Sequence, residues 1–114
     1  MIEQVHPSDL AAWLEKMKSF GQPVVIDVRE PHELQTASIK PQPGFDLVTI
    51  PMGVIPPRLN ELDPTRPTAC MCHHGGRSQR VAEYLSAQGF GHVANISGGI
   101  NAWSIQVDPT VPRY

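Results

Sequence analysis

The sequence predicts an α/β fold in which helices cover both faces of a parallel sheet. Residues 24–28 form a continuous apolar run that ends in charge, the pattern of a parallel strand buried on both faces. Residues 68–72 form a second apolar run, and a glycine-containing loop and a helix expected over 77–88 follow it. Strands that alternate with helices in this way indicate crossover connections, and therefore a parallel sheet.

The first helix is expected over residues 9–20. Ser8 is a plausible N-cap and Gly21 is a plausible stop. Its apolar side chains follow helical spacing: Leu10, Trp13, Leu14 and Met17. The periodicity therefore places one face of this helix against the sheet.

The second half of the chain continues the alternation. A weaker strand is expected over 46–50, a short helix over 54–62, a strand over 92–96 and a last helix over 98–105. The segments 41–44 and 108–114 are expected to be irregular. All 12 prolines lie outside the predicted strands, which supports these boundaries.

Length and composition indicate a single ordinary globular domain over residues 1–114. The chain is 40% hydrophobic and 18% charged, with a formal net charge of −2, which argues against a nucleic-acid or anionic-membrane surface. The 2 cysteines are separated by one residue and form no disulfide framework, so a reducing compartment is expected. The N-terminal residues lack a leader pattern and no run reaches membrane-spanning length, so we expect a cytoplasmic protein.

The residues that carry chemistry follow the strand at 68–72. Cys72 lies at the end of that strand, and Asp27 and Arg29 lie at the end of the strand at 24–28. In parallel sheets, ligands bind outside the carboxyl ends of the strands. Because the helix dipole and loop N–H groups stabilise an anion there, Cys72 is predicted to be a reactive thiolate.

The loop after Cys72 is predicted to form a tight anion cradle. Gly75 and Gly76 are expected to supply the sharp curve and positive φ values that aim successive amides at one point. Arg77 adds a cation suited to an oxyanion such as a sulfonate, and His73 and His74 can donate hydrogen bonds as well. A cradle this tight suits one extra sulfur atom on the thiol, as in a persulfide.

Other conspicuous side chains are expected to be structural. Cys70 lies within a strand and is interpreted as a core thiol. Asp27 is interpreted as a partner for loop amides or for Arg29, with no chemistry assigned. We expect no metal site, because ligands as crowded as those of residues 70–74 rarely close a tetrahedron. Large side chains expected in the core are Trp13, Met17, Tyr84 and Trp103.

Three segments in order resemble the rhodanese-like family of sulfurtransferases in its single-domain form. Residues 25–33 (VIDVREPHE) match the family's strand and Asp-x-Arg-Glu signature, and residues 72–78 (CHHGGRS) match its active-site loop. Residues 93–103 match the closing motif, in which a Gly-Gly turn precedes the last helix. Residues 37–46 are looser and longer than the compact segment usual in the family, which leaves the conformation of that loop open.

The resemblance implies a five-stranded parallel sheet and a two-step sulfur transfer through a persulfide on Cys72. It implies that a small anionic donor such as thiosulfate binds to residues of the loop, and that cyanide, a thiol or a protein accepts the sulfur. No cofactor is expected. The implied substrate-binding residues are His73, His74, Gly75, Gly76, Arg77 and Ser78.

Three alternative functions remain open from the sequence. One is a protein-to-protein persulfide carrier, which uses the same chemistry. Another is a cysteine phosphatase or arsenate reductase on the same fold, although related phosphatases place one more residue between cysteine and arginine than the four found here. The third is a non-catalytic interaction module, and the presence of Cys72 and Arg77 counts against it.

Overall fold

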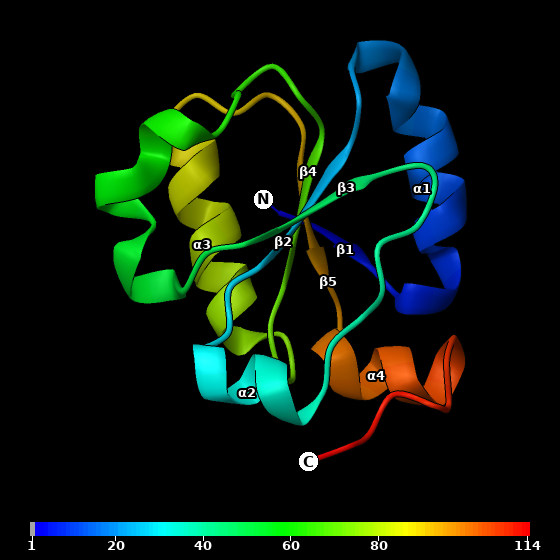
Figure 1. Cartoon of the computed structure of the whole chain (residues 1–114). Helices are drawn as coiled ribbons and strands as arrows, with labels where there is room; N and C mark the ends of the chain where they lie inside the picture. The colour runs from blue at the N-terminus through cyan, green and yellow to red at the C-terminus, as the bar shows by residue number, and fades with distance from the viewer. Residues whose placement is uncertain (1) are drawn as a thin grey trace.

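The computed structural model describes residues 2–114 and contains one five-stranded parallel sheet (Figure 1). The strand order is β1-β5-β4-β2-β3, so β4 is central. In register, Ile26 of β2 lies opposite Val48 of β3 and Cys70 of β4. The strands are β1 (Glu3–Val5), β2 (Val24–Asp27), β3 (Asp46–Thr49), β4 (Thr68–Met71) and β5 (Val93–Ile96). The predicted fold class is confirmed.

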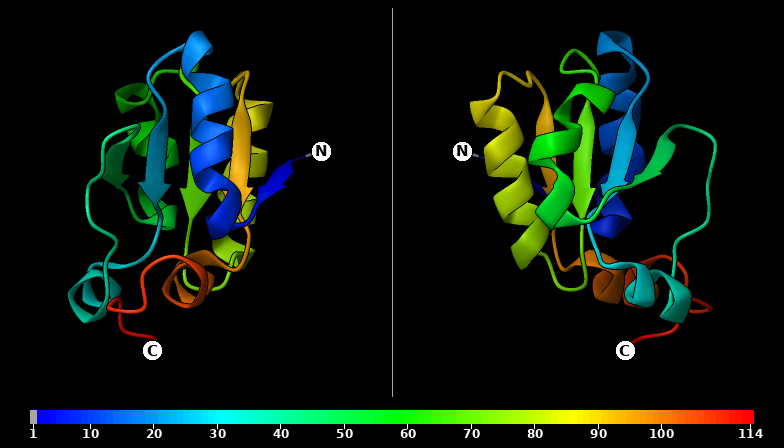
Figure 2. Two further views of the ribbon diagram at one scale, coloured as in Figure 1. Left: turned by 90° about the vertical axis from the view of Figure 1, so that its right-hand side faces the viewer. Right: turned by 60° about the vertical axis from the view of Figure 1, so that its left-hand side comes forward.

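The helices cover both faces of the sheet and one of its ends. Figure 1 shows α1 and α3 on opposite sides of the strands, and Figure 2 shows α2 and α4 at the end toward which the strands point. This end is the carboxyl edge, where the sequence places the chemistry. The α-helices are α1 (Leu10–Met17), α2 (Pro31–Thr36), α3 (Gly76–Ala87) and α4 (Gly99–Gln106). None of the described helices has the length and apolar character needed to cross a membrane.

The side chains of successive strand residues pack alternately into two apolar layers, one on each face of the sheet. Val25 and Met71 belong to the layer that includes Trp13 of α1 and Trp103 of α4. The layer under α3 is built from the intervening strand positions together with helix residues, among them Ile26, Cys70, Cys72, Val81 and Leu85. Because strand side chains alternate in direction, Cys72 faces α3 rather than α1.

The beginning of the first helical segment differs from the prediction. Ser8 is not an N-cap, because it lies inside a short 3₁₀ helix, η1 (Pro7–Asp9), whose N-cap is His6. Pro7 fixes a helical φ and lacks an N–H, so the helical conformation begins two residues earlier than expected. The end of the segment is as predicted: η2 (Lys18–Phe20) stops at Gly21, which has φ 143°.

The helix predicted over 54–62 is replaced by two 3₁₀ helices, η3 (Met52–Val54) and η4 (Pro56–Glu61). Two successive prolines, Pro56 and Pro57, have no N–H to donate and restrict the residues before them, so a regular α-helix does not extend through this segment. The two short helices still cover the α3 side of the sheet, where Ile55 is buried.

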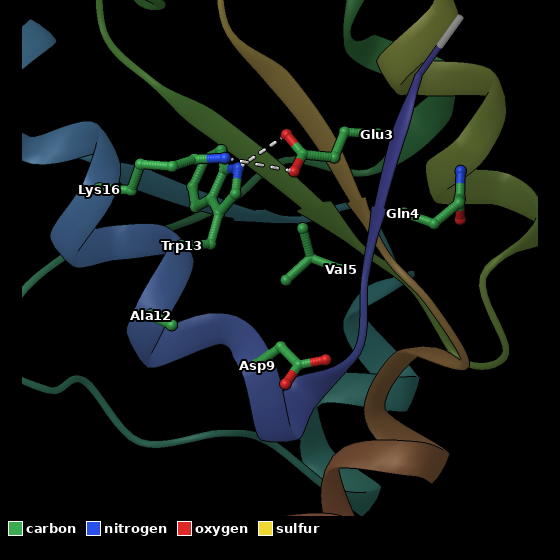
Figure 3. Close-up of a pocket in the computed structure, with 7 residues that line it drawn as sticks. All are labelled: Glu3, Gln4, Val5, Asp9, Ala12, Trp13 and Lys16. Atoms are coloured by element: carbon green, nitrogen blue, oxygen red, sulfur yellow. Dashed lines mark hydrogen bonds and ion pairs between the residues drawn. The ribbon is translucent and has the colours of Figure 1, made fainter.

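The sequence pattern does not predict two elements of the structure, the strand β1 and the helix α2. The edge strand β1 is only three residues long, and so short a segment shows no clear periodicity. Trp13 of α1 donates from Nε1 to Glu3 Oε1 of β1 at 3.1 Å, beside a cavity of about 280 Å³ (Figure 3).

The short helix α2 has Pro31 in its first turn and a capping box between Glu30 and Glu33, and these sequence signals are typical of a helix start.

Residues 37–46, which follow α2 and are longer than the segment usual in the family, are held in place by apolar side chains. Ala37, Ile39 and Phe45 are each about 4% exposed or less and belong to the layer that contains Trp13. Gly44 has φ 103°, which permits the turn just before β3. The polar residues between these anchors lie at the surface, so the extra length does not disturb the sheet.

Candidate active site

Cys72 directly follows the central strand β4, and its sulfur accepts hydrogen bonds from the loop that leads into α3. The Gly75 N–H donates to Cys72 Sγ at 3.0 Å, and Ser78 Oγ lies 3.2 Å from the same sulfur. Gly75 has φ 110°, a left-handed conformation that turns its amide toward the thiol. The predicted positive φ at Gly76 is wrong, because Gly76 is the first residue of α3. One glycine is enough to make the turn.

The two cysteines occupy different environments. Cys70 is 0% exposed inside β4, and burial, followed by the effect of nearby Cys72, raises the pKa of Cys70 to about 12. This confirms its interpretation as a core thiol. Cys72 is 1% exposed, but it lies at the strand end with donors directed at its sulfur. Only Cys72 therefore has partners that stabilise a thiolate or a persulfide.

The first turn of α4 holds the loop after β4 by two backbone hydrogen bonds. The N–H of Ile100 donates to the carbonyl oxygen of Cys72 at 2.8 Å, and the N–H of Asn101 donates to that of His73 at 3.1 Å. These two N–H groups belong to the first turn of α4, where they lack partners within the helix. The Gly98-Gly99 turn thus fixes the backbone of the nucleophile and of the residue after it.

Ser78 links the thiol to the buried amide of Asn95, which in turn contacts the exposed amide of Gln4. Ser78 Oγ lies 2.5 Å from Asn95 Oδ1, closer than it lies to Cys72 Sγ. Asn95 donates from Nδ2 to Gln4 Oε1 at 2.9 Å and to the Gly75 carbonyl at 3.2 Å, so its Oδ1 faces Ser78 as an acceptor. Because the Ser78 hydroxyl has one proton, Asn95 and the thiolate compete for it.

Arg77 is held in a bidentate ion pair. Its Nη1 and Nη2 donate to Glu33 Oε1 and Oε2 at 2.7 and 2.8 Å. The Arg77 guanidinium, acting ahead of the other neighbours, holds the pKa of Glu33 far below its usual range, and Glu33 in turn raises the pKa of Arg77. Both side chains are therefore charged at every working pH, and α2 is tied to α3 across the mouth of the loop.

A second pair lies behind the first. Arg29 is 0% exposed, and it donates from Nε and Nη2 to the two carboxylate oxygens of Asp27 at 2.9 and 2.7 Å. This confirms that Asp27 is a structural partner of Arg29. Tyr114 joins the two pairs, because its hydroxyl accepts from Arg29 Nη1 at 3.0 Å and donates to Glu33 Oε2 at 2.7 Å.

Aromatic stacking covers the outer side of the loop. The ring of His73 stacks on that of Tyr114 at 3.8 Å and 7°, and on that of His74 at 3.9 Å and 26°. Burial, followed by repulsion from His74, lowers the pKa of His73, so His73 is neutral near pH 7. Among the described residues, His73 Nε2 is the one buried side-chain nitrogen or oxygen without a hydrogen-bond partner. An unpaired polar atom beside the nucleophile is suited to receive a ligand atom.

Comparison with known proteins identifies the family to which this fold belongs. The family model for the rhodanese-like domain matches residues 10–106, which is most of the chain. The chain belongs to the rhodanese-like domain family. The matched residues include the loop from Cys72 to Ser78, which the sequence resemblance predicts to be the active-site loop.

Relatives of this rhodanese-like domain include both short and long proteins. The Rhodanese-like/PpiC domain-containing protein 12, chloroplastic, of Arabidopsis thaliana is 36% identical over 99% of this chain, which spans 38% of that protein. The putative sulfurtransferase YtwF of Bacillus subtilis is 38% identical over 87% of this chain and 90% of its own length. The crystal structure of a rhodanese-related protein from Thermoplasma volcanium has a TM-score of 0.76, with 28% identity over 98% of this chain and 99% of that one.

Of the predicted loop residues, Gly75 and Ser78 contact Cys72 Sγ, whereas Arg77 pairs with Glu33 and the two histidines stack on the outer side. Three further residues take part that were not predicted from the sequence. Glu33 has a local signal in the sequence, because it is the N3 residue of the capping box that begins with Glu30. Asn95 lies in a strand otherwise read as apolar, and Tyr114 lies in a tail with no regular structure. Their roles depend on contacts between distant segments, so no local pattern reports them.

Proposed function

We propose that this rhodanese-like domain is a sulfurtransferase that works through a persulfide on Cys72. The Cys72 thiolate attacks the sulfane sulfur of a donor such as thiosulfate, the S–S bond breaks, and sulfite leaves with the bonding electron pair. An acceptor such as cyanide or a thiolate then attacks the terminal sulfur, and the Cys72 thiolate is released. The observation that carries this proposal is the thiol of Cys72, which accepts from the Gly75 amide at the mouth of α3.

A thiol on another protein is a second acceptor within the same chemistry. The putative sulfur carrier protein YrkF of Bacillus subtilis is 36% identical over 83% of this chain, which spans 49% of that protein. That likeness supports a role in carrying sulfane sulfur to another protein. The neutral glycine-rich rim beside the loop, which includes Gly75, Gly76 and Gly98, leaves room for an acceptor to approach.

We propose that the anionic part of the donor is bound by Arg77 together with His73 and His74. Arg77 is the cation of the loop, and its side chain is 33% exposed, so a donor can reach it. Among the described residues His73 Nε2 has no hydrogen-bond partner, so it is free to donate to an oxygen of the donor or leaving group. Ser78 and the loop amides would stabilise the terminal sulfur once it is bound to Cys72.

Incubation with thiosulfate is expected to add one sulfur atom to the protein, and subsequent cyanide is expected to remove it. Intact mass spectrometry measures both steps directly. p-Nitrophenyl phosphate serves as the control substrate, because the four-residue loop leaves too little space for a phosphate above the sulfur. Phosphatase turnover that disappears in Cys72→Ser, without sulfur loading, would establish phosphoryl transfer instead.

Arg77→Ala is expected to lower kcat/KM for thiosulfate by about tenfold or more, since a charge-assisted hydrogen bond contributes roughly 1.5–3 kcal/mol. The loss should be smaller with a small-thiol persulfide, which has no sulfonate group for Arg77 to bind. Steady-state kinetics with both donors makes the comparison. Equal losses with the two donors would show that Arg77 shapes the loop instead of binding the donor's charge.

A further inference from the structure

The cation that would bind an anionic donor is already neutralised by a carboxylate of the same domain. Glu33 occupies both terminal nitrogens of Arg77, and Asp27 does the same for Arg29 behind it. Two positive and two negative side chains therefore stand in matched pairs beside Cys72. The net charge of this cluster is zero, although the loop sequence by itself suggests a cationic site.

Glu33 is fixed by the fold independently of Arg77. Its carboxylate accepts from the Glu30 N–H at 3.0 Å in the capping box of α2, and from the Tyr114 hydroxyl at 2.7 Å. Arg29 also donates to the Glu33 carbonyl at 3.3 Å. The side chain of Glu33 is 9% exposed, whereas that of Arg77 is 33% exposed. The carboxylate is therefore the anchored partner, and the arginine is the partner that is held.

We propose that Glu33 is a positioning residue that holds Arg77 in place and weakens the binding of anionic sulfur donors at Cys72. This inference rests on the proposed function and refines its substrate class. An oxyanion such as thiosulfate must bind, through the N–H groups that Glu33 leaves free, a guanidinium whose charge a buried carboxylate already neutralises. A thiol persulfide has no sulfonate and loses nothing by that neutralisation, so the site as built favours persulfide donors over thiosulfate.

Glu33→Gln keeps the size of the side chain and removes its charge. It is expected to raise kcat/KM for thiosulfate by about tenfold, mainly through a lower KM, because Arg77 regains a charge-assisted bond to the donor. The rate with a small-thiol persulfide should change little. Glu33→Asp keeps the charge and should restore the wild-type preference between the two donors. Glu15→Gln, an exposed residue of α1, removes an equal charge elsewhere and should leave both rates unchanged.

A second measurement does not require sulfur transfer. In a Cys70→Ser background, Cys72 is the sole thiol. The rate of its alkylation by anionic iodoacetate, divided by the rate with neutral iodoacetamide, reports the charge close to Cys72. Glu33→Gln is expected to raise this ratio about tenfold, by the same charge-assisted bond. An unchanged ratio, or equal losses with both sulfur donors, would overturn the role of Glu33. Failure of every donor to load Cys72, with a raised ratio, would reject the proposed function and support the inference.

Discussion

Cys72→Ser is expected to abolish transfer of sulfur from thiosulfate to cyanide, while Cys70→Ser is expected to keep most of it. Cys72 Sγ accepts from the Gly75 N–H and lies 3.2 Å from Ser78 Oγ, and a serine oxygen in its place cannot form a persulfide. Cys70 is enclosed within β4, and its raised pKa of about 12 leaves it protonated at neutral pH. The assay is thiosulfate:cyanide transfer, with intact mass as a check of sulfur loading.

The Cys70 variant also controls for stability. Cys70 packs in the apolar layer under α3, so Cys70→Ser places a hydroxyl in that layer and is expected to lower the free energy of unfolding by about 1–3 kcal/mol. Loss of activity that follows the unfolded fraction would then be a folding effect. A folded Cys70→Ser protein without sulfur transfer would show that the two thiols have been assigned in the wrong order.

The strand, loop and helix around Cys72 could be predicted from the sequence because each depends on local chemistry. The apolar run of β4 indicates a buried strand and the glycines indicate a turn, so the sequence places Cys72 at the junction of strand and loop, where the structure has it. Gly76 shows the limit of this reasoning. Adjacent glycines look equivalent in sequence, but only Gly75 adopts a positive φ, because the helix begins at the next residue.

The charge balance of the site could not be predicted, because it depends on contacts between distant segments. Glu33 lies 44 positions before Arg77, and Tyr114 lies 81 positions after Glu33. The loop by itself predicts a free cation for an anionic donor. The fold supplies a carboxylate that faces it, and a tyrosine from an irregular tail that fixes the carboxylate. Side chains of this kind are visible only after the topology has brought their segments together.

The closing Gly-Gly turn was assigned from resemblance alone, and the structure gives it a physical reason. Gly98 and Gly99 have φ values of 80° and 59°, in the left-handed region that side chains rarely adopt. Gly99 also lies against the nucleophile's own backbone. A Cβ atom there would overlap the Cys72 carbonyl oxygen and lie 2.6 Å from that of His73. The turn therefore sets how closely α4 approaches the active-site loop.

Gly99→Ala is expected to lower kcat/KM by about a hundredfold, because a displacement of roughly 1 Å at a reacting group can cost that much. The added methyl group meets backbone atoms of Cys72 and His73, which cannot rotate away, so the loop or α4 must shift. The two N–H groups that α4 donates to these carbonyls would be lost or lengthened. The strained φ should also lower the free energy of unfolding by about 1–3 kcal/mol. Steady-state kinetics and urea denaturation measure the two effects.

Two glycine variants separate displacement of the loop from strain alone. Gly98→Ala also has a strained positive φ, and its Cβ would overlap Cβ of Ala102 at 2.5 Å instead of the backbone of the loop, so it should lose stability with a smaller loss of activity. In Gly91→Ala the added Cβ would have no neighbouring atom within 4 Å, and Gly91 does not have a positive φ, so this variant should match the wild type in both measurements. If Gly99→Ala retained full activity, the carbonyls of Cys72 and His73 would not have to be fixed by α4, and the loop would hold the thiol by its own hydrogen bonds.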